Sequence, residues 1–454
     1  MQNNKKTIFF SIEIAARELD SKCLLALETA QRGFRAYIGS FRALKQINTK
    51  TSSCIFFHKS TWREVNVKRI VNELGGKFVF LNEELGASIP RSQIKEMITA
   101  GCRFVSADLY SDIFALGQAQ KAEMEALPNL KGVNVHATGW PRLDLWRDEF
   151  QVLNHEKAKT IKNKHGDYYL LVSSFGAISD SSRDEFKKIL AEQAISDHEI
   201  VDYKYNEFKK CLTLIKELSE NLSPQEQIII RPHTSESIDQ WKKYVAGYSN
   251  VSICHEGDVT PWLLASRGTI QFGSTVGIQA AYMGIPSIQS TFSPHEGATD
   301  MPAYEILEQS ESATDMLNKL RAERHTTSES LRKKAVEKLQ CLVANLEGTL
   351  ASEDIAERLS EMDVAPQAPV KFNPFIRSIL CLKEKINYLN YLKKKRFSNE
   401  SGRVKRSKFE KIPGGLKHEE IENRLKRLAE IRGYAPEKVR CRQVAHNLVE
   451  FEME

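Results

Sequence analysis

The feature that most constrains this chain is a repeated alternation of short apolar runs, rich in β-branched and aromatic residues, with longer amphipathic segments. Such alternation predicts parallel strands that are covered on both faces by helices. In the first third of the chain the strand-like runs cover residues 7–14, 34–39, 53–58, 77–81, 103–107 and 132–138. We therefore expect a first α/β lobe built on a parallel sheet.

The same alternation returns after an interruption by Trp140-Pro141-Arg142 and a charged stretch at residues 147–164. A chain of 454 residues is also too long for one ordinary domain. The second series of strand-like runs covers residues 168–173, 227–230, 251–254, 269–272 and 285–289. We predict an α/β fold of two Rossmann-like lobes, at residues 1–146 and 147–362.

The last part of the chain has a different character. A linker with three prolines occupies residues 363–374, and helical patterns follow at residues 375–392 and 419–431. From residue 366 onward there are 21 Lys and Arg against 11 Asp and Glu, a net charge of +10, whereas the preceding residues carry −4. Residues 363–454 are therefore predicted to form a basic helical extension.

This basic extension could bind an anionic membrane surface, bind nucleic acid, or simply pack on the body of the protein. Basic amphipathic helices with aromatic residues are typical of membrane-surface segments. We favour the membrane surface over the nucleic acid, and we expect no nucleic-acid partner.

The cysteines and the hydropathy pattern bear on location. The eight cysteines are scattered, with no CxxC pair and no spacing suited to a structural zinc site. This usage favours a reducing compartment. No stretch approaches the roughly 20 apolar residues of a membrane span, and no signal peptide is apparent. We expect a cytoplasmic protein, with peripheral attachment to the inner face of the cytoplasmic membrane left open.

Arg231, Pro232 and His233 follow a strand of the second series directly. Ligands of open α/β sheets bind beyond the carboxyl ends of the strands. A guanidinium, an imidazole and a helix start that Thr234 or Ser235 could cap would together attract a phosphate or diphosphate. The structural alternative is an Arg and His pair that only binds neighbouring loops.

Two acidic residues of the same segment, Glu236 and Asp239, weigh against the phosphate site because they already place negative charge at the helix start.

A second group at a strand end consists of Gly273, Ser274 and Thr275, again before a helix. Glycine allows close backbone approach, and the hydroxyl and N–H groups can hold phosphate oxygens. Glu256 lies one αβ unit earlier and could accept hydrogen bonds from ribose hydroxyls, or belong to a helix-capping loop. The spacing predicts that all these loops open at the same edge of the sheet.

These segments resemble bacterial surface carbohydrate biosynthesis proteins. The resemblance rests on Ile-Ile-Arg-Pro-His at residues 229–233, His-Glu-Gly at 255–257 with Pro-Trp-Leu-Leu-Ala at 261–265, residues 273–286, and the N-terminal residues 12–14, 17–22 and 33–35. It covers roughly residues 7–360. It implies a GT-B-like fold and, more distantly, similarity to capsule and lipopolysaccharide transferases that take Kdo or related acids from CMP. In those relatives an HP-type motif binds the nucleotide phosphate, which maps onto Pro232 and His233.

The chain departs from the family pattern at two places. Gln279 stands where the helix after the Ser-Thr turn usually carries a Glu, so a ribose-binding carboxylate is replaced by an amide. An acidic Asp-Glu-Glu cluster appears here as Asn82, Glu83 and Glu84. Both changes remove a charge, which weakens the assignment of the donor.

Catalysis is expected in the N-terminal lobe, across from the nucleotide loops. Glu13 ends the first strand, and Arg17, Glu18 and Asp20 follow in what we take to be the first βα loop. A carboxylate there could be a general base or a nucleophile, and the arginine could bind a sugar carboxylate. Glu84 is expected at the same edge. These acids and Arg17 are therefore candidate catalytic residues.

The structural alternative for the same acids is capping of a helix. Asp20 or Ser21 could cap the helix that ends at Gly33. Acidic side chains are favoured at a helix N-terminus whatever their chemistry.

The sequence contains no DxD-type metal cluster in a suitable loop, so we predict a metal-independent enzyme without a cofactor other than its nucleotide-sugar donor. The leading hypothesis is a glycosyltransferase of capsule or O-antigen synthesis that moves Kdo or another ulosonic acid from a CMP-sugar to a glycan or lipid-linked glycan. The alternatives are a UDP-sugar 2-epimerase-like enzyme, a CDP-polyol phosphotransferase, and a non-catalytic scaffold of surface-glycan assembly.

Overall fold

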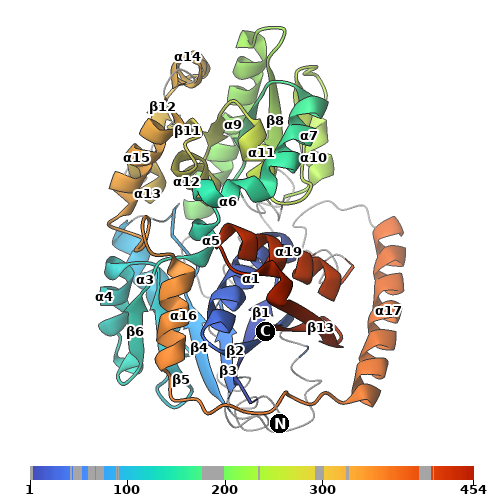
Figure 1. The fold of residues 1–454 in the computed structure, drawn as a ribbon. Coiled ribbons are helices and arrows are strands. Elements are labelled where there is room, and N and C mark those ends of the chain that lie inside the picture. The colour runs from blue at the N-terminus through green and yellow to red at the C-terminus, as the bar shows by residue number, and fades with distance from the viewer. Residues whose placement is uncertain are drawn as a thin grey trace.

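The fold is described from a computed structural model. The structure describes residues 4–40, 54–59, 76–87, 91–175, 199–233, 236–291, 301–323, 327–397, 411–412 and 414–454, together with residues 43, 67 and 89. Two sheets with flanking helices form two lobes, one stacked on the other; the second sheet is parallel, and the first is parallel except for β13 and β14 (Figure 1). The predicted α/β fold is therefore confirmed.

The first lobe is built on an eight-stranded sheet in the order β13-β14-β2-β1-β3-β4-β5-β6. Strands β3 and β4 are almost entirely buried, as expected for parallel strands covered on both faces. The strands are β1 (Lys6–Ile12), β2 (Phe34–Ser40), β3 (Cys54–His58), β4 (Lys77–Leu81), β5 (Tyr110–Ala115), β6 (Asn134–Ala137), β13 (Val439–Ala445) and β14 (Leu448–Met453). Helices of this lobe are α1 (Ala15–Gln31), α3 (Arg91–Cys102), α4 (Gln118–Glu125) and α5 (Pro141–Asp144).

The second lobe has a six-stranded parallel sheet in the order β12-β11-β10-β7-β8-β9. Its strands are β7 (Tyr168–Val172), β8 (Gln227–Arg231), β9 (Val251–Ile253), β10 (Thr269–Gln271), β11 (Ser287–Ser290) and β12 (Glu308–Ser310). Its helices are α9 (Glu199–Asn221), α10 (Ile238–Val245), α11 (Thr260–Ala265), α12 (Thr275–Tyr282), α13 (Pro302–Ile306), α14 (Ala313–Glu323) and α15 (Ser328–Leu339). Helices α6 (Asp148–Gln151) and α7 (His155–His165) connect the lobes in sequence.

Among its parallel strands each sheet has one switch point, where the chain changes the direction in which these strands are added. In the first sheet it lies between β1 and β3, and in the second between β7 and β10. Open α/β sheets bind their ligands at such a point, beyond the carboxyl ends of the strands. The topology alone therefore selects two places for a functional site.

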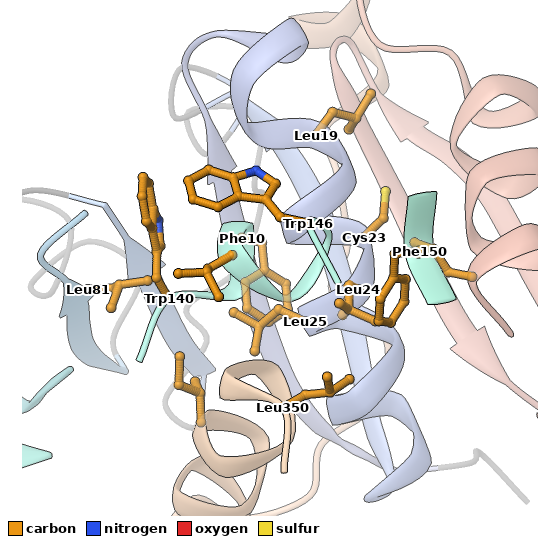
Figure 2. Packing of buried hydrophobic residues seen from close by; sticks show 14 of the residues in the cluster. Phe10, Leu19, Cys23, Leu24, Leu25, Leu81, Trp140, Trp146, Phe150 and Leu350 are labelled. Atoms are coloured by element: carbon orange, nitrogen blue, oxygen red, sulfur yellow. The ribbon is translucent and has the colours of Figure 1, made fainter. Parts of the chain in front are cut away.

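A continuous apolar core joins the lobes. It includes Phe10 and Leu25 of the first lobe and Trp140 and Trp146 around α5 (Figure 2). Tyr282 of the second lobe belongs to the same core. Helix α16 (Ala351–Glu361) returns to pack on α1 and α5.

Buried polar contacts fix this return. The Asp144 carboxylate accepts hydrogen bonds from the Ala351 and Ser352 N–H groups at 2.9 and 2.8 Å, so it caps α16. Arg147 donates to the carbonyl oxygens of Asn345, Gly348 and Thr349. Asp144 and Arg147 are thus structural residues.

The extension is helical only in part, which corrects the prediction. Helices α17 (Pro374–Phe397) and α19 (His418–Ile431) match the expected patterns, but β13 and β14 form a hairpin that pairs antiparallel with β2. In Val439–Ala445 and Leu448–Met453, β-branched and aromatic residues alternate with polar ones, a strand pattern that the high positive charge obscured. Gly39 of β2 permits the approach, since a Cβ there would lie 2.4 Å from the Asn447 carbonyl oxygen.

Two further sequence predictions are wrong. Residues 103–107 are not a strand, and the fifth strand is β5 instead. Helix α1 begins at Ala15 rather than at Asp20 or Ser21, because Ala15, Ala16 and the following residues are strong helix formers. Arg17, Glu18 and Asp20 therefore lie on the helix itself.

Helix α17 stands at the side of the first lobe (Figure 1). In the part of the chain that the structure describes, neither this helix nor any other is long and apolar enough to cross a membrane.

Candidate functional site

We call the carboxyl ends of β1, β3 and β4 the first rim, and those of β7, β8, β9 and β10 the second rim. The first rim carries a compact group of charges at its switch point. Lys59, directly after β3, contacts Glu13 at 2.8 Å and Glu18 at 2.5 Å. Glu18 is 2% exposed, and its other carboxylate oxygen accepts a hydrogen bond from the Glu13 N–H at 2.8 Å. The structure thus brings these two predicted acids together around a lysine.

Glu13 has a second cation, Lys411 of the extension, at 2.5 Å. Burial alone would raise the pKa of Glu13, but the hydrogen bonds from Lys411 and Lys59 lower this pKa to about 2. A general base works best when its pKa lies near the operating pH. Glu13 is therefore a permanently ionised group and a poor general base in this arrangement.

A second ion pair lies deeper in the first rim. Lys22 of α1 is 1% exposed and contacts Glu83, after β4, at 2.8 Å. The Lys22 ammonium also lies over the Phe57 ring, 4.9 Å from its centroid. Because both ions are largely desolvated, each depends on the other for compensation.

Arg17 and Glu84 lie at the exposed side of this rim. Their closest atoms are 3.9 Å apart, and the side chains are 41% and 70% exposed. Such a long, solvated contact holds neither group firmly, so both can turn toward a ligand.

Asp20 does not join this group. It lies on the side of α1 that faces α19, where Arg424 binds its carboxylate. Asp20 therefore forms part of the contact between the extension and the first lobe. Of the five candidate catalytic residues, Glu13, Glu18, Arg17 and Glu84 lie together at the rim.

The loops predicted for the second rim do open at the same edge of the sheet, because β7, β8, β9 and β10 are mutually parallel. Arg231 ends β8 and donates to the carbonyl oxygens of Glu256 and Gly257 at 3.1 and 2.5 Å. This is the loop-binding role that was the structural alternative for Arg231. It links two of the predicted loops and leaves the Glu256 side chain exposed.

His233 is exposed, whereas its backbone is held by two neighbours. Its N–H contacts the Ser173 hydroxyl oxygen at 2.9 Å and the Glu236 carboxylate at 3.2 Å. Glu236 also accepts from the Phe175 N–H and the Trp241 indole N–H. Burial raises the pKa of Glu236 to about 7, although these hydrogen bonds lower it.

Helix α10, which follows this loop, is capped by Ser237, whose side chain accepts from the Gln240 N–H. The caps predicted at residues 234 and 235 lie outside the described residues.

Gly273, Ser274 and Thr275 form the turn expected before α12. Gly273 has a φ of 76° and donates its N–H to the Gln289 side chain at 2.8 Å. Ser274 caps α12 by accepting from the Val276 N–H at 3.2 Å. Within the described part of the chain the Thr275 hydroxyl has no hydrogen-bond partner, so it is available to a ligand at the start of the helix.

Gln279 does not reach the surface of the rim. It is 1% exposed, and its amide N–H donates to the Thr260 hydroxyl at 2.9 Å. Its carbonyl oxygen is buried and has no partner among the described residues. In this conformation Gln279 ties α12 to α11 and presents nothing to a ribose.

Sequence reasoning missed Lys59, Ser173 and the pairing of Lys22 with Glu83. All of them follow strands or lie opposite strand ends, so a systematic list of polar residues after each apolar run would have found Lys59 and Ser173. The partner of Lys22 depends on which strand follows β3 in space, which the sequence does not state.

Across the described residues no cluster of three or more His, Cys, Asp or Glu side chains is arranged to hold a metal ion.

No family model matches the chain, and no curated protein matches it. Among solved structures it is similar to the wall teichoic acid polymerase TagF, at 11% identity over 79% of this chain and 89% of that one, with a TM-score of 0.46. It is similar to Anabaena Alr3699/HepE in complex with UDP-glucose, at 11% identity over 78% and 100% of the chains, with a TM-score of 0.43. A putative UDP-N-acetylglucosamine 2-epimerase from Listeria monocytogenes is 12% identical over 81% and 100%, with a TM-score of 0.46. Likenesses of this level assign the protein to no family.

Proposed function

We propose that the protein is a glycosyltransferase that moves a sugar from a nucleotide-sugar donor to a glycan of a bacterial surface polysaccharide. The nucleotide would bind at the second rim and the acceptor would react at the first. The observation that carries this proposal is the placement of one polar cluster at the switch point of each sheet. Arg142, between the lobes, interacts electrostatically with charged groups of both rims.

The donor in this proposal is a CMP-linked ulosonic acid such as Kdo. A single phosphate needs few cations, which suits a rim whose Arg231 is already bonded to two carbonyl oxygens. The start of α12 with Thr275, and the exposed imidazole of His233, are the groups offered to that phosphate. The sugar carboxylate would face Arg17 at the first rim.

The chemistry would use the charges of the first rim. With a pKa of about 2, Glu13 would stay ionised, as a nucleophile or as a group that stabilises positive charge on the sugar. Lys59 and Arg17 supply positive charge for a developing anion without a metal ion. The Glu84 carboxylate, exposed and loosely held, is the group best placed to act as a general base and accept a proton from an acceptor hydroxyl.

The test is a thermal-shift screen with CMP, CDP, UDP and GDP. At a hundredfold excess over Kd, binding to the native state adds about 2.7 kcal/mol of stability. Stabilisation by CMP alone supports the proposed donor, and a preference for UDP favours a UDP-sugar transferase or a 2-epimerase-like enzyme. Loss of the shift in His233→Ala, with unchanged melting of the free protein, would place the nucleotide at the second rim.

A non-catalytic scaffold of surface-glycan assembly is the second candidate. The observation that favours it is that several polar side chains of the second rim form hydrogen bonds within the protein. These are Arg231, Glu236 and Gln279. No thermal response to any of the four nucleotides would support this reading over the first.

We further propose that α17 attaches the protein to an anionic membrane surface at the inner face of the cytoplasmic membrane. Its residues 375, 379, 382, 386 and 389 repeat at intervals of four and three, which places them on one face. This face is solvent-exposed, with Phe375 at 72% and Leu382 at 62%. Lys383, Lys385 and Lys393 are exposed beside it, as in helices that lie on anionic lipid.

Deletion of the whole extension would not test this proposal, because β14 and α19 belong to the first lobe. The matched variants are Leu382→Glu on α17 and Val152→Glu, which changes an exposed apolar residue of similar kind elsewhere. We expect Leu382→Glu to reduce cosedimentation with phosphatidylglycerol vesicles and Val152→Glu to leave it unchanged. Equal binding by both variants would dispose of the membrane role.

A further inference from the structure

The side chain of Arg142 is held in place by aromatic rings, but its positive charge has no ion-pair partner among the residues that the structure describes. It lies on α5, directly after Trp140 and Pro141. Gly139, with a φ of 82°, lets this segment pass close to the backbone at Ala344, since a Cβ there would lie 2.4 Å from the Ala344 carbonyl oxygen. Trp140 is 1% exposed and Trp146 is 2% exposed, and both indoles lie in the core that joins the lobes (Figure 2).

The guanidinium of Arg142 makes cation–π contacts with both of these indoles. Its central carbon lies 5.4 Å from the Trp140 ring centroid and 5.9 Å from that of Trp146, and the two rings are inclined at 73° to each other. Contacts of this kind hold the cation without using its N–H donors in hydrogen bonds. A lysine at the same place would keep the charge but lose the fork of donors.

The guanidinium of Arg142 has no hydrogen bond or ion pair with any residue that the structure describes. The acidic groups that act on its charge are otherwise engaged: Glu18 with Lys59, Glu83 with Lys22, and the Asp258 carboxylate with the Thr260 N–H at 2.8 Å. An unpaired cation among paired groups is the group that an incoming anion would meet.

The surroundings of Arg142 belong to both lobes. Burial, and then the neighbouring positive charge of Arg17, lower the pKa of Arg142 to about 10, while Asp258, Glu83 and Glu18 act in the opposite direction. Arg17 and Glu18 lie on the first rim, and Asp258 follows the Glu256–Gly257 segment that Arg231 holds at the second rim. Arg142 therefore lies within electrostatic range of charged groups of both rims.

We propose that Arg142, with Arg17, binds an anionic group of the substrate where the nucleotide and the transferred sugar meet. This inference rests on the proposed function for the identity of the ligand. The anion is either the phosphate or diphosphate of the nucleotide, or the carboxylate of an acidic sugar, and both match a guanidinium edge in bidentate fashion. Arg142 is thus a ligand-binding residue, placed by Trp140 and Trp146 before the ligand arrives.

A cation–π contact by itself does not make a binding site, and the chain supplies its own control. Arg103 lies with its guanidinium carbon 4.6 Å from the Phe104 ring centroid, but it is exposed on the first lobe and belongs to neither rim. Arg142→Gln and Arg103→Gln therefore remove the same charge and the same kind of contact. Only the first change removes a cation between the rims.

The experiment is isothermal titration of the full-length protein with CMP, CDP, UDP, inorganic pyrophosphate and free Kdo. We expect Arg142→Gln to weaken at least one of these ligands by about tenfold or more, the usual effect of losing charge-assisted hydrogen bonds, and Arg103→Gln to bind all of them as the wild type does. Weakening of pyrophosphate and CDP identifies the phosphate as the anion, and weakening of Kdo identifies the carboxylate. If Arg142→Gln does not fold, Arg142→Lys serves instead, with weakening of the same ligand expected.

The outcomes separate this inference from the proposed function. Wild-type affinity of the Arg142 variant for every ligand would overturn the inference while the nucleotide site stands. Binding of pyrophosphate or Kdo through Arg142, with no affinity for any nucleotide, would keep the anion site and overturn the glycosyltransferase. If the wild-type protein binds none of the five ligands, both are overturned.

Discussion

The two rims differ in how their charges are satisfied. At the first rim, carboxylates and amines pair with one another, as Glu13 and Glu18 do with Lys59. At the second rim, the charged side chains bind backbone groups and neutral side chains, as Arg231 and Glu236 do. Side chains that neutralise each other can rearrange when a substrate brings its own charge, whereas side chains that hold loops keep a binding surface in shape. In the proposed function the first rim carries the chemistry and the second the recognition.

The two rims also differ in the pKa values of their carboxyl groups. Two lysines keep the pKa of Glu13 low, while burial keeps the pKa of Glu236 high. The predictions below change charged groups of the two rims, and one changes a charge on the side of α1 that faces α19.

The largest effect is expected at the buried pair of the first rim. Lys22→Met leaves Glu83 buried without its cation, which should lower the free energy of unfolding by about 3–5 kcal/mol. The double variant Lys22→Met/Glu83→Gln should recover part of this loss because no charge is left unpaired. Denaturant unfolding measures both; a loss below about 1 kcal/mol in the single variant would mean that the pair is solvated.

Arg231→Met is expected to have the next largest effect. It removes two hydrogen bonds to the Glu256–Gly257 loop and should cost about 1–3 kcal/mol. His233→Ala, two residues away and exposed, should stay within about 0.5 kcal/mol of the wild type. If both variants unfold alike in a denaturant titration, Arg231 does not hold the loop.

The pH dependence should run in opposite directions at the two rims. Glu13 has a folded-state pKa of about 2, below its ordinary value of 4.5, so its stabilising effect is present above pH 4.5 and is lost as the pH falls toward 2. Glu236 has a folded-state pKa of about 7, so the native state binds more protons and this group's contribution falls as the pH rises from 4.5 to 7.

Unfolding curves of Glu13→Gln and Glu236→Gln against the wild type check this. The stability difference between wild type and Glu13→Gln should shrink at acid pH. The difference for Glu236→Gln should change between pH 4.5 and 7, in favour of the variant as the pH rises. If the stability differences of the two variants changed with pH in the same direction, the electrostatic distinction between the rims would be wrong.

The smallest effect is expected for Asp20→Asn. Its ion pair with Arg424 is partly exposed, with the Asp20 side chain 44% accessible, and such pairs contribute up to about 1 kcal/mol. Glycosyl transfer, assayed with the donor found in the thermal-shift screen, should be unchanged. A loss of turnover without a loss of stability would return Asp20 to the catalytic group.

The sequence predicted the two sheets well because each central strand is an uninterrupted apolar run. Residues 77–81 were placed correctly to the residue. The hairpin of β13 and β14 was missed because its membership of the first sheet depends on a partner, β2, that lies about four hundred residues earlier in the chain. Local pattern carries no information about such a pairing.

For the site, the sequence could place residues at strand ends but not decide their partners. Arg231 and Gly273 were correctly located, yet the use of the Arg231 guanidinium by the Glu256–Gly257 carbonyls is a tertiary contact. Asp20 was misplaced because helix propensity extended α1 toward the strand. Arg142 was noted only as part of a break between lobes, since its unpaired state depends on the positions of two tryptophans and both rims.

The most direct test of the division between recognition and chemistry is calorimetric titration of matched variants, His233→Ala at the second rim and Glu13→Gln at the first, with the nucleotide that gives the largest thermal shift. The account predicts that His233→Ala loses at least about tenfold in affinity, while Glu13→Gln binds as tightly as the wild type but no longer transfers sugar. Undiminished binding by His233→Ala, or loss of nucleotide binding in Glu13→Gln alone, would contradict it.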